Sequence, residues 1–361
     1  MLAASMSAMS ACALQAQPNY TVEFPVEPEN NNTMAYLYDW DNNVKLDSVI
    51  VTDGLVKFSG HTDAPFIARL IINGARGPIF IVEDGDVVLG QEDGARTSLN
   101  AKMGSYSARM KAIVDEFKSI DRNDSTQMAR AEALQKEYQD VPRKAYEENK
   151  GNILGLYYFL QLAYDMNLSE IDAAIAADRM LGESKRVQAI RTNLLAKAET
   201  SEGKHYKDFT VTYDGKEEKF SSYIKPGRYT LVDFWASWCG PCIRQTKYIK
   251  ELYAKYKDKG LDVLGVAVWD EPANTLKAIK SHGLEWPCII NAQTVPTDLY
   301  GISGIPCILL INPEGIIVSR DKMGDELVEA VDSAMADFQP QAMALPADSA
   351  AADTASVSVI F

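Results

Sequence analysis

The sequence contains few of the residues that bind metals or nucleic acids. It has only 3 histidines and 5 cysteines in 361 residues, and its lysines and arginines are spread along the chain without forming a basic segment. Nucleic-acid-binding proteins need a cluster of positive charge for the phosphate backbone, and docking on an anionic membrane needs the same. The net charge of −14 therefore argues against both kinds of partner.

Long apolar runs are also missing. No internal apolar stretch approaches the roughly 20 residues that a helix needs to cross a membrane, so we predict no transmembrane span. With 47% hydrophobic and 24% charged residues, the composition is that of a soluble globular protein. The length is enough for two or three domains of about 150 residues and for a sizeable core.

Residues 1–16 carry no charge at all. The segment consists mostly of Ala, Ser, Met and Leu, like the apolar and cleavage regions of a secretory signal peptide without its basic start. The sequence allows two cleavage sites for such a signal. Either cleavage follows Ala16, or the segment ends at a lipoprotein-type site at which Cys12 would take a lipid. Both predict an exported protein of the periplasm or cell envelope, lipid-anchored through Cys12 in the second case. The alternative is a disordered cytosolic tail.

From residue 17 to 100 the hydrophobic residues alternate with a period of two, as in half-buried strands. Asp53-Gly54 and Asp84-Gly85 each separate two such runs, which predicts hairpins. We expect residues 17–100 to form a small antiparallel β-sandwich. Three aromatic side chains pack within it or, alternatively, line a binding surface: Tyr36, Tyr38 and Trp40.

Residues 101–203 change to a helical period. Hydrophobic residues recur every three or four positions, for example at Tyr106, Met110 and Ile113, which predicts amphipathic helices. The run Ser169-Glu170-Ile171-Asp172 resembles a capping box at the start of another helix. No catalytic pattern occurs here, so we interpret the segment as a packing unit.

Strand and helix patterns alternate from residue 204 to 338. Strands are expected at 229–234, 261–268, 307–311 and 316–318, and helices at 243–256, 272–282 and 324–335. This order predicts an α/β domain, with a mixed sheet and helices on both of its faces. Residues 339–361 are rich in Ala, Ser, Asp and Pro and are expected to be disordered.

A Cys-Gly-Pro-Cys motif follows the first of those strands. Cys239 is expected at the N-terminus of the next helix, where backbone N–H groups and the helix dipole favour a thiolate. Cys242 lies near enough to close a disulfide with it, and Pro241 suits the first helical turn. The alternative is half of a zinc site, but the three histidines are scattered and no second Cys-x-x-Cys is present.

The segment Val232-Asp233-Phe234-Trp235-Ala236-Ser237-Trp238-Cys239-Gly240-Pro241-Cys242 resembles the thioredoxin superfamily. With its export signal and extra N-terminal region, the chain is similar to TlpA/ResA-type exported thiol–disulfide oxidoreductases. The resemblance covers roughly residues 206–338 and implies a thioredoxin-like fold there. The sandwich and the helical segment resemble, more weakly, an N-terminal domain of unknown function that precedes such modules.

The resemblance implies roles for several residues. Cys239 matches the attacking cysteine, Cys242 the resolving cysteine, and Asp233 the buried acid that helps move the proton of the resolving thiol. A buried and poorly paired carboxylate has a raised pKa and serves as a base near neutral pH. The alternative for Asp233 is a structural residue at the end of a strand. We expect no metal and no cofactor beyond the redox-active disulfide.

Substrate contacts follow from the same resemblance. Ile305-Pro306 matches the cis-proline loop that faces the disulfide and holds the substrate chain in an extended pairing. An ordinary trans loop proline is the alternative. The remaining candidates for substrate contact are Trp238, which is expected to be partly exposed beside the motif, and then Gly240 and Pro241.

The sequence departs from the family pattern at three positions. Gln245 stands where ResA-type proteins often have Glu, Lys247 where thioredoxin has a helix-kinking proline, and Cys307 where the family mostly has Thr. Cys307 is either a small core residue or a third thiol that modulates the redox pair. Cys288 is expected to be inert core, and a Cys288–Cys307 disulfide is a further alternative.

These features predict an exported thiol–disulfide oxidoreductase that reduces disulfide-containing proteins. A membrane reductant-transfer protein is the implied partner that restores the dithiol. Because Gly-Pro between the cysteines resembles reducing thioredoxins, we expect a reduction potential on the order of −270 to −200 mV. One alternative is a peroxiredoxin-like peroxidase, which Ala236 disfavours because a Thr or Ser stands at that position there. The other is a non-enzymatic envelope protein that binds through the N-terminal sandwich.

Overall fold

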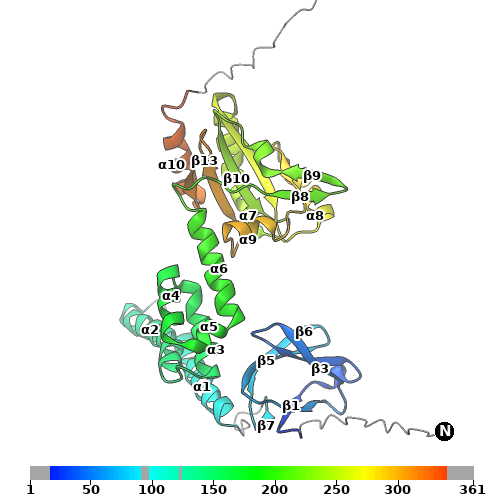
Figure 1. The fold of residues 1–361 in the computed structure, drawn as a ribbon. Helices are drawn as coiled ribbons and strands as arrows, with labels where there is room; N and C mark the ends of the chain where they lie inside the picture. The colour runs from blue at the N-terminus through cyan, green and yellow to red at the C-terminus, as the bar shows by residue number, and fades with distance from the viewer. Residues whose placement is uncertain (1–16, 91–96, 122–123, 340–361) are drawn as a thin grey trace, which may run out of the picture. The chain divides into compact units, whose positions relative to one another are not determined.

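The computed structural model describes residues 17–90, 97–121 and 124–339. The chain divides into two compact units, residues 1–191 and 192–361, and the division falls within helix α6 (Lys185–Glu199; Figure 1). The predicted signal peptide with Cys12, and the predicted disordered tail from residue 340 on, lie outside the described residues. Among the described helices, none is long and apolar enough to cross a membrane.

The N-terminal unit begins with two β-sheets, one of order β4-β1-β7 and one of order β3-β2-β5-β6. Inward-facing residues of both sheets, among them Val22, Leu37 and Leu70, form one buried cluster. Two sheets that enclose a common core make a β-sandwich, as predicted. The strands are β1 (Tyr20–Pro25), β2 (Met34–Asp39), β3 (Val44–Ile50), β4 (Leu55–Gly60), β5 (Phe66–Ile72), β6 (Ala75–Val82) and β7 (Gly85–Val88).

Both Asp-Gly turns join strands of different sheets. At Asp53-Gly54 only a minimal hairpin forms, an antiparallel bridge between Thr52 and Leu55, and at Asp84-Gly85 the predicted hairpin is wrong. Asp53-Gly54 leads from β3 to β4, and Asp84-Gly85 leads from β6 to β7. Asp53 and Gly54 do have positive φ angles, 52° and 67°, as a tight turn of this sequence requires. Strand β7 pairs parallel with β1, whereas the other pairings of the sandwich are antiparallel. A turn sequence fixes the local reversal of the chain and leaves the choice of partner strand to the core.

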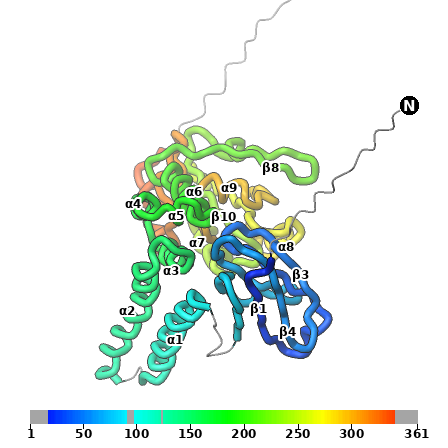
Figure 2. The backbone as a smooth tube through the Cα atoms, turned by 60° about the horizontal axis from the view of Figure 1, so that its bottom comes forward, coloured from blue at the N-terminus to red at the C-terminus, as the bar shows by residue number. Residues whose placement is uncertain are grey.

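Helices complete the N-terminal unit. They are α1 (Ser98–Lys118), α2 (Ser125–Glu147), α3 (Ile153–Leu162), α4 (Leu168–Ala177), α5 (Arg179–Glu183) and the first part of α6. Helices α1 and α2 lie side by side (Figure 2) and bury predicted positions such as Tyr106, Ile113 and Leu134. The capping box of α4 is formed by Asn167 and Glu170, two residues before the predicted start at Ser169, because the Asn167 side chain accepts the backbone N–H of Glu170.

The C-terminal unit contains a five-stranded mixed sheet of order β12-β11-β10-β13-β14. Its central strand β10 runs parallel to β11 and antiparallel to β13. The strands are β10 (Tyr229–Trp235), β11 (Leu261–Ala267), β12 (Cys288–Ile289), β13 (Cys307–Ile311) and β14 (Ile317–Arg320). The helices are α7 (Gly240–Tyr256), α8 (Pro272–His282), α9 (Val295–Tyr300) and α10 (Gly324–Met335).

Strand β10 is buried on both faces. Leu231 packs with residues of α7 and α10 on one face, whereas Phe234 packs with Tyr300 of α9 on the other (Figure 1). Helices therefore cover both faces of the sheet, as the alternating pattern predicts. Every second side chain of β10 lies beneath α7, and this alternation places Asp233 on the same face as Leu231.

The hairpin β8–β9 (Thr210–Tyr213 and Lys216–Lys219) and the helix α9 were not predicted from the sequence. Strand β9 reads Lys-Glu-Glu-Lys, so it has no hydrophobic alternation by which a strand is recognised. Helix α9 has six residues, which is too short for a helical period to show.

A buried arginine ties β14 to neighbouring segments of the C-terminal unit. The guanidinium of Arg320 donates hydrogen bonds to the carbonyl oxygens of Thr200 and Tyr300, both at 2.8 Å, and its side chain is 5% exposed. These acceptors lie just after α6 and at the end of α9. One side chain thus satisfies carbonyl groups from two segments that are distant in sequence.

We expect Arg320→Met to destabilise the C-terminal unit by about 2–4 kcal/mol, because it removes charge-assisted hydrogen bonds and leaves buried acceptors unpaired. Urea unfolding of the oxidised protein measures the change. Arg244 is exposed, so Arg244→Met is the matched control and should change the free energy of unfolding little. Equal stability of the two variants would show that the Arg320 hydrogen bonds contribute nothing.

Candidate active site

The two motif cysteines lie at the junction between β10 and α7. Strand β10 ends at Trp235, and Cys239 is the N-cap residue of α7. Its Sγ accepts the backbone N–H of Cys242 at 3.1 Å, and the two cysteines are disulfide-bonded. The N–H groups at this helix end favour negative charge on the Cys239 sulfur once the bond is reduced. Both side chains are buried, whereas Trp238, Gly240 and Pro241 beside them are exposed.

Asp233 has the environment expected of a base that works near neutral pH. It lies on β10, two residues before the strand ends, and is almost fully buried. Its Oδ1 has no hydrogen-bond partner among the described residues. Burial without a partner disfavours the charged form and raises the pKa of Asp233 to about 7.

Asp233 belongs to a row of three residues that crosses the sheet. Asp233 of β10 lies opposite Gly265 of β11, which lies opposite Cys288 of β12. A β-carbon added at Gly265 would come within 2.7 Å of the Cys288 Sγ and 3.1 Å of the Trp235 Nε1. The missing side chain therefore makes room for the thiol and the indole beside the carboxyl group. Burial, with a smaller contribution from the Asp233 charge, raises the pKa of Cys288 to about 12.

The loop that carries Trp238 is held by Asp270, a residue that the sequence analysis missed. One carboxylate oxygen of Asp270 accepts the backbone N–H of Ser237 at 2.8 Å, and the other accepts the Ser237 hydroxyl at 2.9 Å. Thr275 donates its hydroxyl to the same carboxylate at 2.7 Å. The Trp238 indole N–H donates to the Trp269 carbonyl oxygen at 3.0 Å. The available signal in the sequence was an acidic residue two positions before Pro272, the proline that opens α8.

The Ile305–Pro306 peptide bond is cis, as the resemblance implies. The carbonyl oxygen of Ile305 lies 3.8 Å from the Cys239 Sγ, so this loop adjoins the disulfide. Gly304, just before it, is exposed. Backbone groups of this loop are thus available to an extended chain that approaches the sulfur pair.

The other two described cysteines are free and lie apart. Strands β11 and β10 separate Cys288 from Cys307, which at the usual strand spacing is about 14 Å, whereas a disulfide needs Cα atoms within about 7 Å. The Cys288–Cys307 disulfide is therefore excluded. Cys307 packs in the core on the face opposite α7 and donates its thiol to Asp321 at 3.1 Å. Burial and the Asp321 charge raise its pKa.

The two helix positions that depart from the family pattern have different surroundings. Gln245 accepts the backbone N–H of Gly324 through its Oε1 at 2.8 Å, which caps the start of α10. The amide therefore serves packing between α7 and α10. Lys247, at the position of the helix-kinking proline, is exposed on α7.

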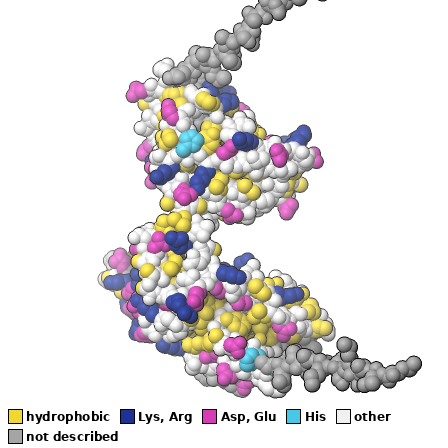
Figure 3. Space-filling model, in the orientation of Figure 1, with side chains coloured by type: hydrophobic (Ala, Val, Ile, Leu, Met, Phe, Trp, Pro, Cys, Tyr) yellow, Lys and Arg dark blue, Asp and Glu magenta, His cyan; other side chains and the backbone are white. Residues whose placement is uncertain are grey.

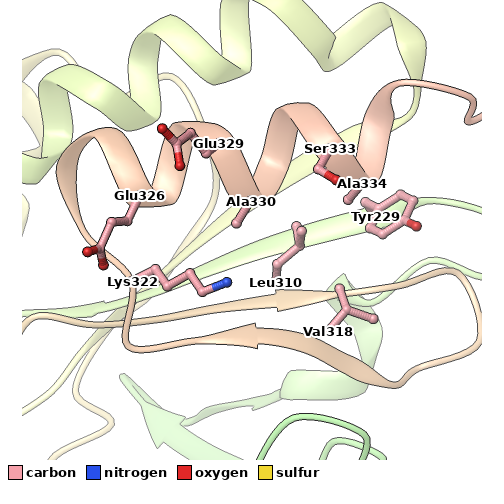
Figure 4. Close-up of a pocket in the computed structure, with 9 residues that line it drawn as sticks. All are labelled: Tyr229, Leu310, Val318, Lys322, Glu326, Glu329, Ala330, Ser333 and Ala334. Carbon is pink, nitrogen blue, oxygen red and sulfur yellow. The ribbon is translucent and has the colours of Figure 1, made fainter.

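A separate hollow of about 530 Å³ lies between α10 and the strands β10, β13 and β14 (Figure 4). Tyr229, Lys322 and Glu326 are among its lining residues, and none of the predicted site residues is. Tyr229 begins β10, whereas the motif follows the other end of that strand. The two motif cysteines therefore lie apart from this hollow. Among the described residues, no group of three or more His, Cys, Asp or Glu side chains is arranged to hold a metal ion.

Comparison with known proteins gives matches for both units. Residues 203–320 match the AhpC/TSA family, and residues 20–132 match a domain of unknown function, DUF4369. The chain is 32% identical over 109 residues to the thiol-disulfide oxidoreductase ResA of Geobacillus thermodenitrificans, which is 30% of this chain and 62% of that protein. It is 29% identical over 123 residues to ResA of Bacillus subtilis, which is 34% of this chain and 68% of that protein.

The chain thus spans less than two thirds of the length of the first of these relatives. Among solved structures, the thioredoxin domain of a thiol-disulfide oxidoreductase from Bacteroides vulgatus is 29% identical. That likeness covers 37% of this chain and 98% of the other, with a TM-score of 0.34.

We expect Asp233→Asn to stabilise the oxidised protein more at pH 8 than at pH 5. The folded-state pKa of about 7 exceeds the ordinary value of 3.8, so the contribution of the protonated carboxyl is complete below pH 4 and is lost as the pH rises through 7. Asparagine does not titrate and avoids that loss. The free energy of unfolding of Asp233→Asn, relative to the unchanged protein, should therefore rise by about 2 kcal/mol between pH 5 and pH 8. Urea unfolding measures it.

Asp258→Asn, at an exposed position, is the control and should show no such growth. The same gain for Asp233→Asn at both pH values would contradict a raised pKa.

We expect only Cys239, of the four described cysteines, to be alkylated rapidly after reduction. Burial keeps Cys288 and Cys307 as thiols at pH 7, and Cys242 is inaccessible. Iodoacetamide labelling of the reduced native protein, followed by peptide mass spectrometry, measures each site, and unfolded protein provides the fully labelled control. Labelling of Cys307 as fast as Cys239 would favour the interpretation of Cys307 as a reactive modulating thiol.

Proposed function

We propose that this protein, which joins a DUF4369 domain to an AhpC/TSA thioredoxin-like domain, reduces disulfide bonds of exported proteins. One observation carries the proposal: a cysteine pair at a helix N-terminus adjoins a cis-proline loop and follows a strand with a buried, unpaired carboxyl group. This arrangement supplies a stabilised thiolate, a second thiol within bonding distance and a base. Relatives named thiol-disulfide oxidoreductases support the same activity.

In the first step the Cys239 thiolate attacks one sulfur of a substrate disulfide. The substrate S–S bond breaks, a mixed disulfide forms on Cys239, and the second substrate sulfur leaves as a thiolate. The helix N-terminus stabilises the attacking thiolate, and the exposed rim of Trp238, Gly240 and Pro241 admits the substrate. Backbone groups of the Ile305-Pro306 loop hold the substrate chain in an extended conformation.

In the second step Cys242 resolves the mixed disulfide. Its thiol must lose a proton before its sulfur attacks Cys239 Sγ, and the Asp233 carboxylate accepts that proton. The intramolecular disulfide then forms and the first substrate sulfur leaves as a thiolate. Two electrons have moved from the dithiol to the substrate. A base with a pKa near 7 is half ionised at neutral pH, which suits it to this transfer.

The oxidised pair then needs a reductant. We propose a membrane reductant-transfer protein as that partner, because the uncharged leader of residues 1–16 implies export from the cytoplasm. Lipid attachment at Cys12 would keep the protein at the membrane that holds the partner. A reduction potential on the order of −270 to −200 mV fits this direction of electron flow.

We expect Cys242→Ala to accumulate mixed disulfides on Cys239, because the attacking sulfur is retained and the resolving one is lost. The measurement is non-reducing electrophoresis of the purified variant, followed by mass spectrometry of the captured species. Cys239→Ser should capture nothing and should lose reductase activity toward a protein disulfide. Cys288→Ala is the matched control and should capture nothing while remaining active.

Absence of any adduct on Cys239 in the Cys242→Ala variant would overturn reduction of protein disulfides. Rapid turnover of hydrogen peroxide by the unchanged protein would instead favour a peroxidase, although Ala236 offers no hydroxyl near Cys239 to bind a peroxide.

A further inference from the structure

The N-terminal unit contains a hollow of about 540 Å³ on the outer face of its four-stranded sheet. Strand β5 of that sheet adjoins helix α3 (Figure 1). The side chains that matter here are three arginines and three aromatic residues: Tyr38, Trp40, Arg69, Arg76, Tyr164 and Arg186. None of the lining residues is an aspartate or a glutamate. We call this hollow the arginine pocket.

Strand alternation explains how the sheet places these residues. Leu37 and Leu70 point into the sandwich core, so their neighbours Tyr38 and Arg69, which lie opposite each other, point outward. Arg76 lies on β6 opposite Ile71, two residues along β5 from Arg69. Two guanidinium groups therefore occupy adjacent strands of one exposed sheet face. The start of α6 adds the third, Arg186.

The protein compensates the positive charges of the pocket only in part. Among the described residues, neither Arg69 nor Arg76 has a carboxylate within ion-pair distance, and the buried Nε of Arg69 donates to nothing. Burial, together with the Arg76 charge, lowers the pKa of Arg69. Burial also lowers the pKa of Arg186; the nearby Asp41 carboxylate opposes this effect, and the charges of Arg69 and Arg76 add to it. The three like charges thus destabilise one another while the pocket is empty.

One carboxylate, that of Asp41, lies near Arg186 and partly compensates its charge. Asp41 accepts the Ser184 hydroxyl at 2.6 Å and the backbone N–H groups of Lys185 and Arg186, both at 3.2 Å, at the N-terminus of α6. The chain has 14 more acidic than basic residues, and elsewhere on the visible surface basic side chains stand among acidic ones (Figure 3). A site at which positive charge exceeds negative charge is therefore unusual in this protein and needs a physical explanation.

Aromatic side chains give the pocket a firm apolar wall. The Arg186 guanidinium lies 4.0 Å from the centre of the Trp40 ring, and its Nε donates to the Trp40 carbonyl oxygen at 2.6 Å. Arg186 is thereby held in place before any ligand arrives. Tyr164 is 81% exposed, which leaves its ring available for contact.

We propose that the arginine pocket binds a small organic polyanion, a phosphorylated or polycarboxylated molecule whose flat or apolar part lies against Tyr38, Trp40 and Tyr164. Guanidinium groups bind phosphate and carboxylate oxygens in pairs, and a ligand with two or more negative charges removes the repulsion between the arginines. The volume suits a ligand of metabolite size. A nucleic acid is disfavoured because the protein as a whole is strongly acidic.

The test is isothermal titration of the full-length oxidised protein with pyrophosphate and with citrate, at matched ionic strength. The two probes separate phosphoryl from carboxylate recognition, and saturable binding of either one is expected. Arg76→Gln and Arg69→Gln should each raise the Kd at least about tenfold, since a hydrogen bond to a charged group contributes a factor of that order. Arg143→Gln removes the same charge from an exposed position on α2 and should leave the Kd unchanged.

If the arginines served only to stabilise the fold, Arg76→Gln would lower the stability and leave binding unchanged. The binding proposal expects the opposite. Arg76 is exposed at the start of β6, so Arg76→Gln should fold and, by removing repulsion, should unfold at the same or a higher urea concentration than the unchanged protein. Binding of neither probe, or equal Kd values for Arg76→Gln and Arg143→Gln, overturns the proposal. Lower stability of Arg76→Gln with no loss of binding also overturns it.

Discussion

Burial of the Asp233 carboxyl group in the central strand is the constraint on which the redox site depends. Strand β10 is covered on both faces, so a charge within it has no water to stabilise it, and the carboxyl holds its proton to about pH 7. The same strand ends at the motif and delivers the sulfur pair to the start of α7. One buried strand thus sets both the pKa of the Asp233 carboxyl group and the position of the two sulfur atoms.

The sequence was sufficient wherever a short segment determines its own structure. Pro272 and Gly324 mark the starts of α8 and α10, and the expected bounds of both helices agree with the observed ones. The motif predicted the position of Cys239 at a helix N-terminus for the same reason. Strand pairing depends on distant partners. Both Asp-Gly turns were therefore recognised as turns, but their flanking strands pair in different sheets, and the Thr52–Leu55 bridge is all that forms of the two predicted hairpins.

The parts of the two sites that could not be predicted come from residues that meet only through the fold. Asp270 reaches the Trp238 loop from the end of the neighbouring strand β11, so no local pattern connects the two. The arginine pocket draws on β5, β6 and α6, which are separated by more than a hundred residues at the extreme. Tyr38 and Trp40 were noticed as a surface alternative, but their basic partners were not.

Gly265, which lies between Asp233 and Cys288 in the sheet, limits which residues can stand at position 288 of the neighbouring strand. A methyl group at position 265 would overlap the sulfur of Cys288 and crowd the Trp235 indole, and a smaller residue at position 288 would relieve the closer of these two contacts. Substitutions at positions 265 and 288 are therefore expected to occur together. Related sequences that carry alanine at 265 should carry a compensating smaller residue at 288, a correlated substitution that arises from steric fit rather than from chemistry.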